Sequence, residues 1–450
     1  MGRKSHAREL SLWVNGKHAA EWGIPARGDV ELQYDSSWVG SDEGRPLSLA
    51  LPFSLDNAPI KGKPVDNYFD NLLPDSEPIR KRLRSRFHTE SSGAFDLLEA
   101  IGRDCVGAVQ LLPSGEKPKN VQAIEAKPLT ESEIETALIQ TVAPSSVAAN
   151  LSDDDFRISI AGAQEKSAFL YHEGQWCRPI GATPTTHIFK LPLGLVGGIQ
   201  LDMSTSVENE WLCATILRSY GLPVASCEIS KFGSQKVLVV ERFDRQLHSS
   251  GKYWLRLIQE DFCQATVTPS SKKYERDGGP GILDLARVLR GSVSRDQDLE
   301  TLIKAQLLFW MLAAGDGHAK NFSIRILNQG RYQLTPLYDV LSFWPIIGEA
   351  PNKITWHNVK LAMSMHGKHK HYLIKDIRRR HFNETAAKCG LGETAEPIIN
   401  KILSQTPEVL GSVQGKVPKD FPQQVLDTIL NGLSESAKRL DSMPTTQLKR

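Results

Sequence analysis

The amino-acid sequence predicts an α+β protein of two lobes, the first rich in β-strands and the second mainly helical. Strand-like runs separated by turn residues dominate the first half of the chain, whereas apolar residues beyond residue 280 recur with helical spacing. A segment at 113–150 is poor in large apolar residues and holds four prolines, which is typical of a boundary. We therefore expect an extra N-terminal subdomain at 1–148, a strand-rich unit at 149–258 and a helical unit at 259–450.

Length and composition are those of an ordinary soluble globular protein. The 450 residues can form two or three domains, 40% of them are apolar, and the formal net charge is only +2, so any basic function must be local. The six cysteines form no C-x-x-C pair and indicate reduced thiols. No stretch reads as a secretory signal or a membrane span, so we expect a cytoplasmic protein.

The N-terminal subdomain should consist of short strands with some helix. An alternating apolar run ends in Asn15-Gly16, which is a hairpin signal. The run Arg45–Pro52 also favours a strand, 106–112 favours an extended segment, and 68–73 favours a helix. Thr130 and Glu133 have the spacing of a capping box, which predicts a short helix at that point.

The strand-rich unit opens with a turn of small residues between two strands. Residues 156–160 and 167–171 are strand-like, and Ala161 to Lys166 connect them. Such a turn lets backbone N–H groups approach an anion closely, although an ordinary hairpin is the simpler interpretation.

Next comes a strand at 186–192 that carries one lysine, Lys190, among apolar neighbours. This lysine is either an edge residue whose amine reaches water or a phosphate ligand. A helix is expected at 208–217, with Glu210 on it, and a buried strand at 236–240 ends in a polar segment, 241–244. The sequence leaves open whether Glu210 pairs with Lys190.

The helical unit contains the most specific chemical pattern. Helices are expected at 282–289 and 299–312, and the second stops at Gly315. Asp316 and Asn321 follow as D-x-x-x-x-N, and Asp339 lies 18 residues beyond Asn321. A phosphoryl-transfer site is often assembled in this way: one Asp orients and deprotonates a hydroxyl, while the Asn and the later Asp hold Mg²⁺ on nucleotide phosphates. A Gly-rich helix end with two turn-forming Asp residues would give the same pattern.

Taken in order, these parts follow the protein-kinase template: small-residue turn, strand lysine, helix glutamate, buried strand with a polar hinge, D-x-x-x-x-N and a final Asp. Each part is weak alone, but their order favours a kinase.

Two further segments allow alternative interpretations. The polar, Gly-rich loop at 269–281 is either a mobile substrate-facing segment or a connection. The basic cluster at 366–381 is either a nucleic-acid footprint or a solvated helix end.

Long phrases of the sequence resemble one family. The stretch at 153–170, DDDFRISIAGAQEKSAFL, resembles the signature of the HipA-type serine/threonine kinases, the toxins of HipBA toxin–antitoxin pairs. The same family's phrases recur as TPTTHIFKLP at 183–192, VERFD at 240–244, GDGHAKNFS at 315–323 and TPLYD at 335–339. RPLSLALP, FDNLLPDS and IGRDCVGAV extend the resemblance into the N-terminal subdomain, so it covers almost the whole chain.

The resemblance implies a kinase-like fold and a role for each matching residue. Asp316 falls on the catalytic Asp that activates the acceptor hydroxyl, Asn321 and Asp339 on the Mg²⁺ ligands, and Lys190 on the lysine that contacts the ATP phosphates. Further ATP contacts are implied for a phosphate loop, a hinge and the catalytic turn: Ala161, Gly162, Ala163, Gln164, Glu165 and Lys166; Glu241, Arg242 and Phe243; and His318, Ala319, Lys320, Asn321, Tyr338 and Asp339.

Ser159 matches the serine that these kinases autophosphorylate. A phosphate there would carry a charge of roughly −1.5 to −2 beside the phosphate loop. We expect it to repel the ATP phosphates and inactivate the protein.

The resemblance also implies partners. It predicts a HipB-like helix-turn-helix antitoxin, with which the protein forms a heterotetramer or larger complex. That complex would bind operator DNA, with the protein acting as corepressor. The predicted substrate is a component of translation such as an aminoacyl-tRNA synthetase. The family's DNA contact falls near 387–390, where Lys388 is the only basic residue, and Arg379 and Arg380 of the neighbouring basic cluster are further candidates.

Two other functions fit part of the pattern. A catalytically silent, ATP-binding corepressor would work only through antitoxin and DNA, and a small-molecule kinase could share the fold. The joint presence of Lys190, Asp316, Asn321 and Asp339 favours catalysis over the first, and the long family phrases argue against the second.

Overall fold

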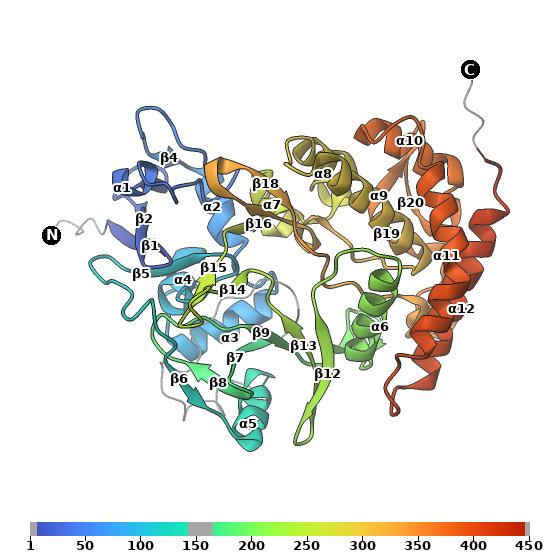
Figure 1. The fold of residues 1–450 in the computed structure, drawn as a ribbon, viewed down its shortest axis with the longest axis horizontal. Helices are drawn as coiled ribbons and strands as arrows, with labels where there is room; N and C mark the ends of the chain where they lie inside the picture. The colour runs from blue at the N-terminus through green and yellow to red at the C-terminus, as the bar shows by residue number, and fades with distance from the viewer. Residues whose placement is uncertain (1–6, 143–163, 165, 446–450) are drawn as a thin grey trace.

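The computed structural model describes residues 7–142, 164 and 166–445. The strand-rich parts lie on one side of the molecule, and the long C-terminal helices form the opposite edge (Figure 1). The mixed α/β architecture with a strand-rich and a helical lobe confirms the fold class that the sequence predicts.

The N-terminal subdomain is a five-stranded antiparallel sheet in the order β4-β3-β2-β1-β5, covered by helices. Its strands are β1 (Arg8–Val14), β2 (Lys17–Ile24), β3 (Glu31–Tyr34), β4 (Ile60–Lys61) and β5 (Val109–Pro113). Its helices are α1 (Ser36–Val39), α2 (Lys63–Asp70), α3 (Glu77–Phe87) and α4 (Ala94–Ile101). The β1–β2 hairpin turns at Asn15 and Gly16, both with positive φ, which confirms the hairpin prediction.

The sheet and helices enclose one apolar core. Trp22 of β2 stacks on Phe69 of α2 with ring centroids 3.7 Å apart, and Phe95 of α4 packs against the same indole. Ile258 and Ile326 from later in the chain complete this core, so the subdomain is packed onto the rest of the molecule rather than tethered to it.

The strand predicted at Arg45–Pro52 is absent, and the segment is irregular. Leu47 and Leu51 are fully buried, so the apolar alternation correctly marks burial. The backbone, however, bends so that the Ser48 hydroxyl and the Leu49 amide both donate to the Glu260 carboxyl, at 2.5 and 2.8 Å. These bonds replace the pairing that a strand would require.

The second sheet has six strands in the order β12-β13-β9-β7-β8-β6. They are β6 (Ala126–Pro128), β7 (Lys166–His172), β8 (Gln175–Pro179), β9 (His187–Lys190), β12 (Cys227–Phe232) and β13 (Gln235–Glu241). Helix α5 (Glu131–Val142) packs on β7, β12 and β13, and α6 (Ser206–Ser219) contacts β12 and β13. Two short antiparallel pairs accompany it, β10 (Gly194–Val196) with β11 (Leu201–Met203) and β14 (Arg245–Leu247) with β15 (Trp254–Arg256).

Most predicted elements of this unit are confirmed. The capping box is present, because the Glu133 amide donates to the Thr130 hydroxyl and the Thr130 amide donates to the Glu133 carboxylate. Strand β6 is part of this sheet and helix α5 packs on it, although both come before residue 148 in the chain. The domain boundary predicted at residue 148 therefore stays a prediction. The strand predicted at 156–160 lies outside the described residues.

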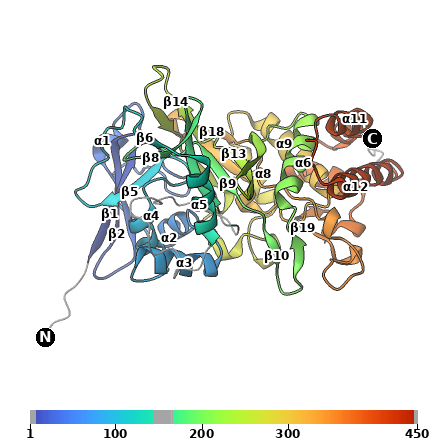
Figure 2. The same cartoon turned by 90° about the horizontal axis from the view of Figure 1, so that it is seen from below.

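The helical lobe is built around α9 (Arg295–Met311), which is buried on almost every side from Leu299 onward. Around it lie α7 (Phe262–Ala265), α8 (Ile282–Leu289), α10 (Arg379–Cys389), α11 (Glu396–Gln414) and α12 (Gln423–Asp441). Its strands are β16 (Gln259–Asp261), β17 (Ser323–Ile326) and β18 (Tyr332–Leu334), with β19 (Lys360–His366) paired to β20 (Lys370–Leu373). Helices α11 and α12 form the outer layer, with both contacting α6 and α9 (Figure 2). The predicted helices at 282–289 and 299–312 are confirmed.

No helix in the ranges given above is long and apolar enough to cross a membrane. All six cysteines are free, and five of them are buried.

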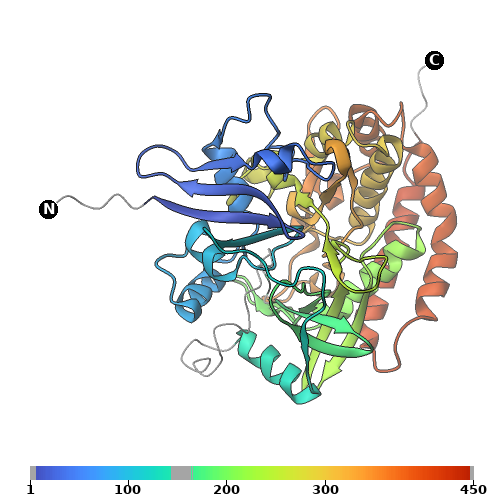
Figure 3. The ribbon, with the colours of Figure 1, turned by 60° about the vertical axis from the view of Figure 1, so that its left-hand side comes forward.

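A buried cluster of charges joins the N-terminal subdomain to the segment after β13. Asp104 contacts Arg242 at 3.3 Å, Arg245 at 2.9 Å and Arg256 at 3.1 Å, and Asp244 contacts the first two at 2.8 and 3.0 Å. Burial opposes ionisation of Asp104, but the three guanidinium groups outweigh it and hold its pKa well below its usual range. The N-terminal sheet lies directly beside the lobe that carries this segment (Figure 3).

We expect Asp104→Ala to lower the free energy of unfolding by roughly 3–5 kcal/mol, because it leaves buried guanidinium groups without their shared carboxylate. Chemical denaturation measures the change. Glu116→Ala is the matched control, since Glu116 forms a half-exposed pair with Arg103 at 3.3 Å and should change stability by less than about 1 kcal/mol. Similar values for the two variants would contradict the structural role of Asp104.

Glu260 should make stability depend on pH. Burial raises the pKa of its carboxyl to about 8 from an ordinary 4.5, against the two hydrogen bonds that it accepts. A raised folded-state pKa means that its stabilising contribution is complete below 4.5 and is lost as the pH rises through about 8. Between pH 5 and pH 9 the wild type should therefore lose on the order of 2–4 kcal/mol relative to Glu260→Gln, which cannot ionise. A pH-independent difference between the two proteins would refute this.

Candidate active site

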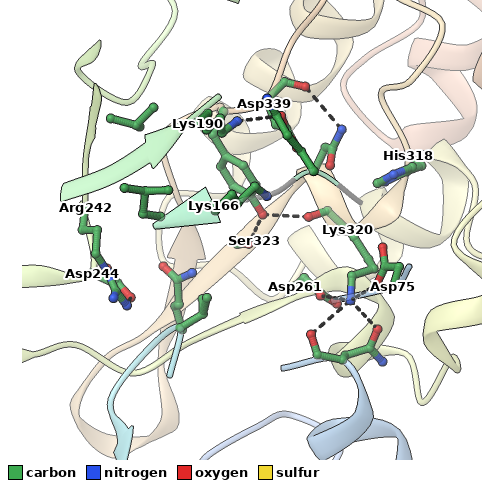
Figure 4. Close-up of a pocket in the computed structure, with 18 of the residues that line it drawn as sticks. Asp75, Lys166, Lys190, Arg242, Asp244, Asp261, His318, Lys320, Ser323 and Asp339 are labelled. Carbon is green, nitrogen blue, oxygen red and sulfur yellow. Dashed lines mark hydrogen bonds and ion pairs between the residues drawn. The ribbon is translucent and has the colours of Figure 1, made fainter. Parts of the chain in front are cut away.

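A cavity of about 180 Å³ lies where the N-terminal subdomain, the six-stranded sheet and the helical lobe meet. Its lining includes Asp75 from the first, Lys166 and Lys190 from the second and Asp339 from the third (Figure 4), and Asn71 also comes from the first. Three segments far apart in the sequence thus supply polar side chains to one hollow.

One ammonium group joins two lobes on the sheet side of the cavity. The Lys190 amine of β9 contacts Glu210 of α6 and Asp339, both at 2.6 Å. Burial disfavours the charged amine, but the two carboxylates outweigh it and raise the pKa of Lys190. In turn the pKa of Asp339 is lowered, because Lys190 and Lys166 outweigh its burial. Glu210, whose pairing the sequence left open, therefore pairs with Lys190.

Asp339 is held in a costly backbone conformation. Its φ is 61°, in the left-handed region that residues other than glycine rarely adopt. Such conformations cost of order 1–3 kcal/mol and persist where surrounding contacts impose them, often at functional sites. Here the conformation accompanies the contact of Asp339 with Lys190.

The turn after α9 has no room for side chains on either side of Asp316. A Cβ atom on Gly315 would lie 2.4 Å from the Phe343 ring, and one on Gly317 would lie 2.6 Å from the Phe309 ring. The side-chain amide of Asn321 donates to the Asp316 carbonyl at 2.8 Å and so closes the turn. The structure thus brings Asp316, Asn321 and Asp339 to one cavity, as their spacing predicts.

A tyrosine that the sequence did not single out contacts Asp316. The Tyr274 hydroxyl donates to the Asp316 carboxylate, and the Tyr274 ring packs edge-on against the His318 ring, with centroids 5.0 Å apart. Burial raises the pKa of Asp316, and the Tyr274 hydrogen bond opposes the rise. The loop at 269–281 therefore reaches the site rather than serving only as a connection.

The predicted ATP-contacting residues of the turn occupy different positions. His318 lines the cavity, burial lowers its pKa to about 3, and its buried Nδ1 atom meets no hydrogen-bond partner in the described part of the chain. Ala319 is buried in the core of the lobe and does not line the cavity. The Lys320 amine is already engaged by Asn71 at 2.9 Å, Asp75 at 3.1 Å and Asp261 at 3.5 Å.

The hinge segment lines the cavity with Glu241, Arg242 and Phe243. The amides of Glu241 and Arg242 donate to the carbonyls of Ser226 and Thr186, whereas the Phe243 amide donates to no group in the described ranges. The Phe243 ring lies 5.6 Å from the Tyr338 ring. The Arg242 side chain belongs to the buried charge cluster around Asp104, which holds the hinge segment in place.

Of the predicted phosphate loop, Ala161, Gly162, Ala163 and Glu165 lie outside the described residues, as does Ser159. Gln164 and Lys166 are described, and both line the cavity. Gln164 donates to the Leu191 carbonyl, and Lys166 pairs in register with Lys190.

Asn321 and Asp339 carry oxygen atoms of the kind that a hard divalent cation takes as ligands. No group of three His, Cys, Asp or Glu side chains placed to hold a metal occurs among the residues described. Mg²⁺ in phosphoryl-transfer sites needs fewer protein ligands, because substrate phosphates and water supply the rest. Asn321 uses its amide nitrogen in the turn, which leaves its amide oxygen for a metal beside the Asp339 carboxylate.

The DNA candidates lie away from this cavity, and one of them is poorly placed. Arg380 and Lys388 are exposed on α10. Arg379 is only 2% exposed, and its guanidinium forms an ion pair with Glu396 at 2.5 Å. A buried, paired arginine cannot reach a nucleic-acid backbone without breaking that pair.

Sequence reasoning missed Tyr274, Lys273, Asn71 and Asp75 as lining or contact residues. Asn71 and Asp75 stand in the phrase FDNLLPDS, which was noted only for its resemblance. Tyr274 and Lys273 stand in a polar loop whose composition gave no signal.

The two-lobed fold and the joined Lys190, Glu210, Asp316, Asn321 and Asp339 define a kinase. The family model for the HipA-like C-terminal domain matches residues 158–410, and that for the HipA N-terminal domain matches residues 10–112. The chain therefore belongs to the HipA family.

Individual relatives agree with this assignment. The protein is 32% identical over 341 residues to Putative kinase Y4mE of Sinorhizobium fredii, which covers 74% of this chain and 77% of that one. It is 28% identical over 349 residues to the serine/threonine-protein kinase toxin HipA of Shewanella oneidensis, covering 74% and 75%. The fold matches that of HipA in a solved complex of Shewanella oneidensis HipA, HipB and operator DNA, with a TM-score of 0.76, 21% identity and coverage of 96% and 98%.

Proposed function

We propose that this protein is an ATP- and Mg²⁺-dependent serine/threonine protein kinase that serves as the toxin of a toxin–antitoxin pair. One observation carries the enzymatic part of the proposal. Lys190 joins Glu210 to Asp339 in the cavity that also holds Asp316 and Asn321.

In this proposal Asp316 is the general base. Its carboxylate accepts the hydrogen of the acceptor hydroxyl and takes the proton as the hydroxyl oxygen bonds to the γ-phosphorus and the bond to ADP breaks. The Tyr274 hydroxyl now occupies a position from which a hydroxyl group donates to Asp316. A substrate serine would have to displace Tyr274 to reach the same oxygen.

The remaining residues bind and orient the nucleotide. Lys190, held by two carboxylates, is the cation placed to meet its phosphates, and the unpartnered Nδ1 atom of His318 offers a further polar contact. The Phe243 amide, which donates to no backbone carbonyl among the described residues, is the hinge donor that we assign to the adenine edge. Asn321 and Asp339 would hold Mg²⁺, which neutralises charge on the phosphate oxygens. We assign Lys320 to positioning, because its amine ties the catalytic turn to Asn71 and Asp75.

The relatives support the cellular part of the proposal. The Shewanella oneidensis protein is named a toxin, and its solved complex contains HipB and operator DNA. We propose a HipB-like antitoxin and operator DNA as partners of this chain, a protein of translation as its substrate, and Ser159 as its autophosphorylation site. Exposed Arg380 and Lys388 are the DNA contacts that we retain.

We expect Asp316→Asn and Asp339→Asn to lower phosphoryl transfer from labelled ATP by roughly 10²-fold or more, since each removes a group that acts on the reacting atoms. Mass spectrometry of the labelled protein should place the phosphate on Ser159. Asp296→Asn is the control, because this side chain is 92% exposed at the start of α9.

Undiminished labelling in both site variants would reject the catalytic assignment, and label elsewhere would reject only the role of Ser159. Absence of label in the wild type, with ATP still bound, would favour the silent corepressor instead.

We expect Tyr274→Phe to separate two pH profiles. Loss of the hydroxyl removes a hydrogen bond that lowers the pKa of Asp316, while the ring keeps its packing on His318. The acidic limb of kcat/KM for an acceptor peptide, which reports the free enzyme, should therefore move to higher pH. The acidic limb of the kcat profile should stay at the same pH, because the bound acceptor has already displaced Tyr274. Equal movement of both limbs, or of neither, would contradict the displacement.

A further inference from the structure

A second cavity lies at the opposite end of β17 from Ser323, which lines the active site. Its volume is about 320 Å³. Arg45 of the N-terminal subdomain, Arg325 of β17 and Arg331 before β18 line it, over apolar side chains that include Leu257, Ile258 and Ile326. We refer to this cavity as the arginine pocket.

The arginine pocket carries positive charge without compensation. No carboxylate is among its described lining residues. Arg325 is half-buried, and its guanidinium group forms no hydrogen bond or ion pair within the ranges that the structure describes. Arg45 donates to the Asn328 side chain, but its buried Nε atom has no acceptor there, and Arg331 makes one long contact of 3.4 Å to the Asn328 carbonyl.

Neighbouring acids do not neutralise this charge. Glu43 is the acid that acts on Arg45, but its carboxylate is bound to Lys17 at 2.9 Å. Burial lowers the pKa of Arg45, and the charge of Arg325 lowers it further. Arg331 is exposed, but Arg45 and Arg325 are half-buried, and like charges in such positions cost free energy unless an anion joins them. The buried arginines around Asp104 show how this chain compensates such groups when their role is structural.

We propose that the arginine pocket binds a phosphate-bearing small molecule. A guanidinium group presents a planar fork of donors that matches phosphate oxygens, and three of them can share a doubly charged group. The volume is near the lower end of small-ligand pockets, roughly 300–1,000 Å³. The apolar side chains beneath the arginines suit the non-phosphate part of such a molecule.

The position of the pocket gives binding a consequence. A phosphate held by Arg45 on one side and by Arg325 and Arg331 on the other connects the N-terminal subdomain to β17 and β18. Residue Ser323 of the same strand lines the active site. A ligand there therefore stabilises the contact between the N-terminal subdomain and β17, and the free energy of unfolding rises with the logarithm of the ligand concentration once that concentration exceeds Kd.

The test titrates the full-length protein with pyrophosphate, inorganic phosphate and adenosine monophosphate in magnesium-free buffer, by calorimetry and thermal unfolding. We expect the double variant R325M/R331M to weaken pyrophosphate binding at this site at least tenfold. Control variant R287M, whose exposed arginine pairs with Asp284 at 2.8 Å, should bind as the wild type does. Tighter binding of the nucleotide than of inorganic phosphate would identify a nucleoside phosphate as the ligand class, and equal binding would identify phosphate itself.

A second readout excludes a merely structural role for Arg325. Removal of an unpartnered cation by R325M should raise the thermal midpoint of the anion-free protein and abolish the increase that pyrophosphate gives to the wild type. The titration contains neither ATP nor Mg²⁺, so its outcome does not depend on kinase activity. The proposal is overturned if the wild type binds none of the three probes at millimolar concentration or if R325M/R331M binds them unchanged.

Discussion

The structure depends on the carboxylate of Asp104, which three buried guanidinium groups share. Asp104 follows the last helix of the N-terminal subdomain, whereas Arg242 follows β13, Arg245 begins β14 and Arg256 ends β15. One buried carboxylate of the N-terminal subdomain thus fixes the position of the hinge relative to a sheet that begins at residue 8. Because each ion would be costly to bury alone, the three segments are stable in this arrangement only together.

The same coupling extends into the active site, so the N-terminal subdomain is part of the site. Asn71 and Asp75 hold the amine of Lys320. Lys320 belongs to the turn that runs from Asp316 to Asn321 and leads into β17. Lys273, on the loop that carries Tyr274, contacts Asp75 at 3.0 Å. A shift of the subdomain would therefore move the turn that carries Asp316 and the loop that carries Tyr274 at the same time.

Sequence patterns correctly predicted the structural features that depend on residues near one another in the chain. The Asn15-Gly16 hairpin, the Thr130–Glu133 box and helix α8 were all placed correctly, because turn, cap and helical period are local. The meeting of Asp316 with Asp339 was predicted from an established spacing. The contact of Tyr274 with Asp316, 42 residues away, has no local signal. The strand predicted at Arg45–Pro52 was wrong, because the residue that bends this segment, Glu260, lies more than 200 residues further along the chain.

Charge shows the same limit, because a count of cations in the sequence does not reveal which of them are free. Within the basic cluster at 366–381, Arg379 is buried against Glu396, and Lys370 contacts Glu275 at 2.8 Å, so the charge that it offers to solvent is smaller than the sequence suggests. Arg45, Arg325 and Arg331 are separated in the sequence and formed no cluster there, yet they meet in one cavity whose described lining holds no carboxylate. A half-buried cation without a partner lowers the stability of the fold, whereas a cation in an ion pair has a structural role. In this protein the unpaired cations, rather than the densest run of basic residues, are therefore the stronger indication of a binding site.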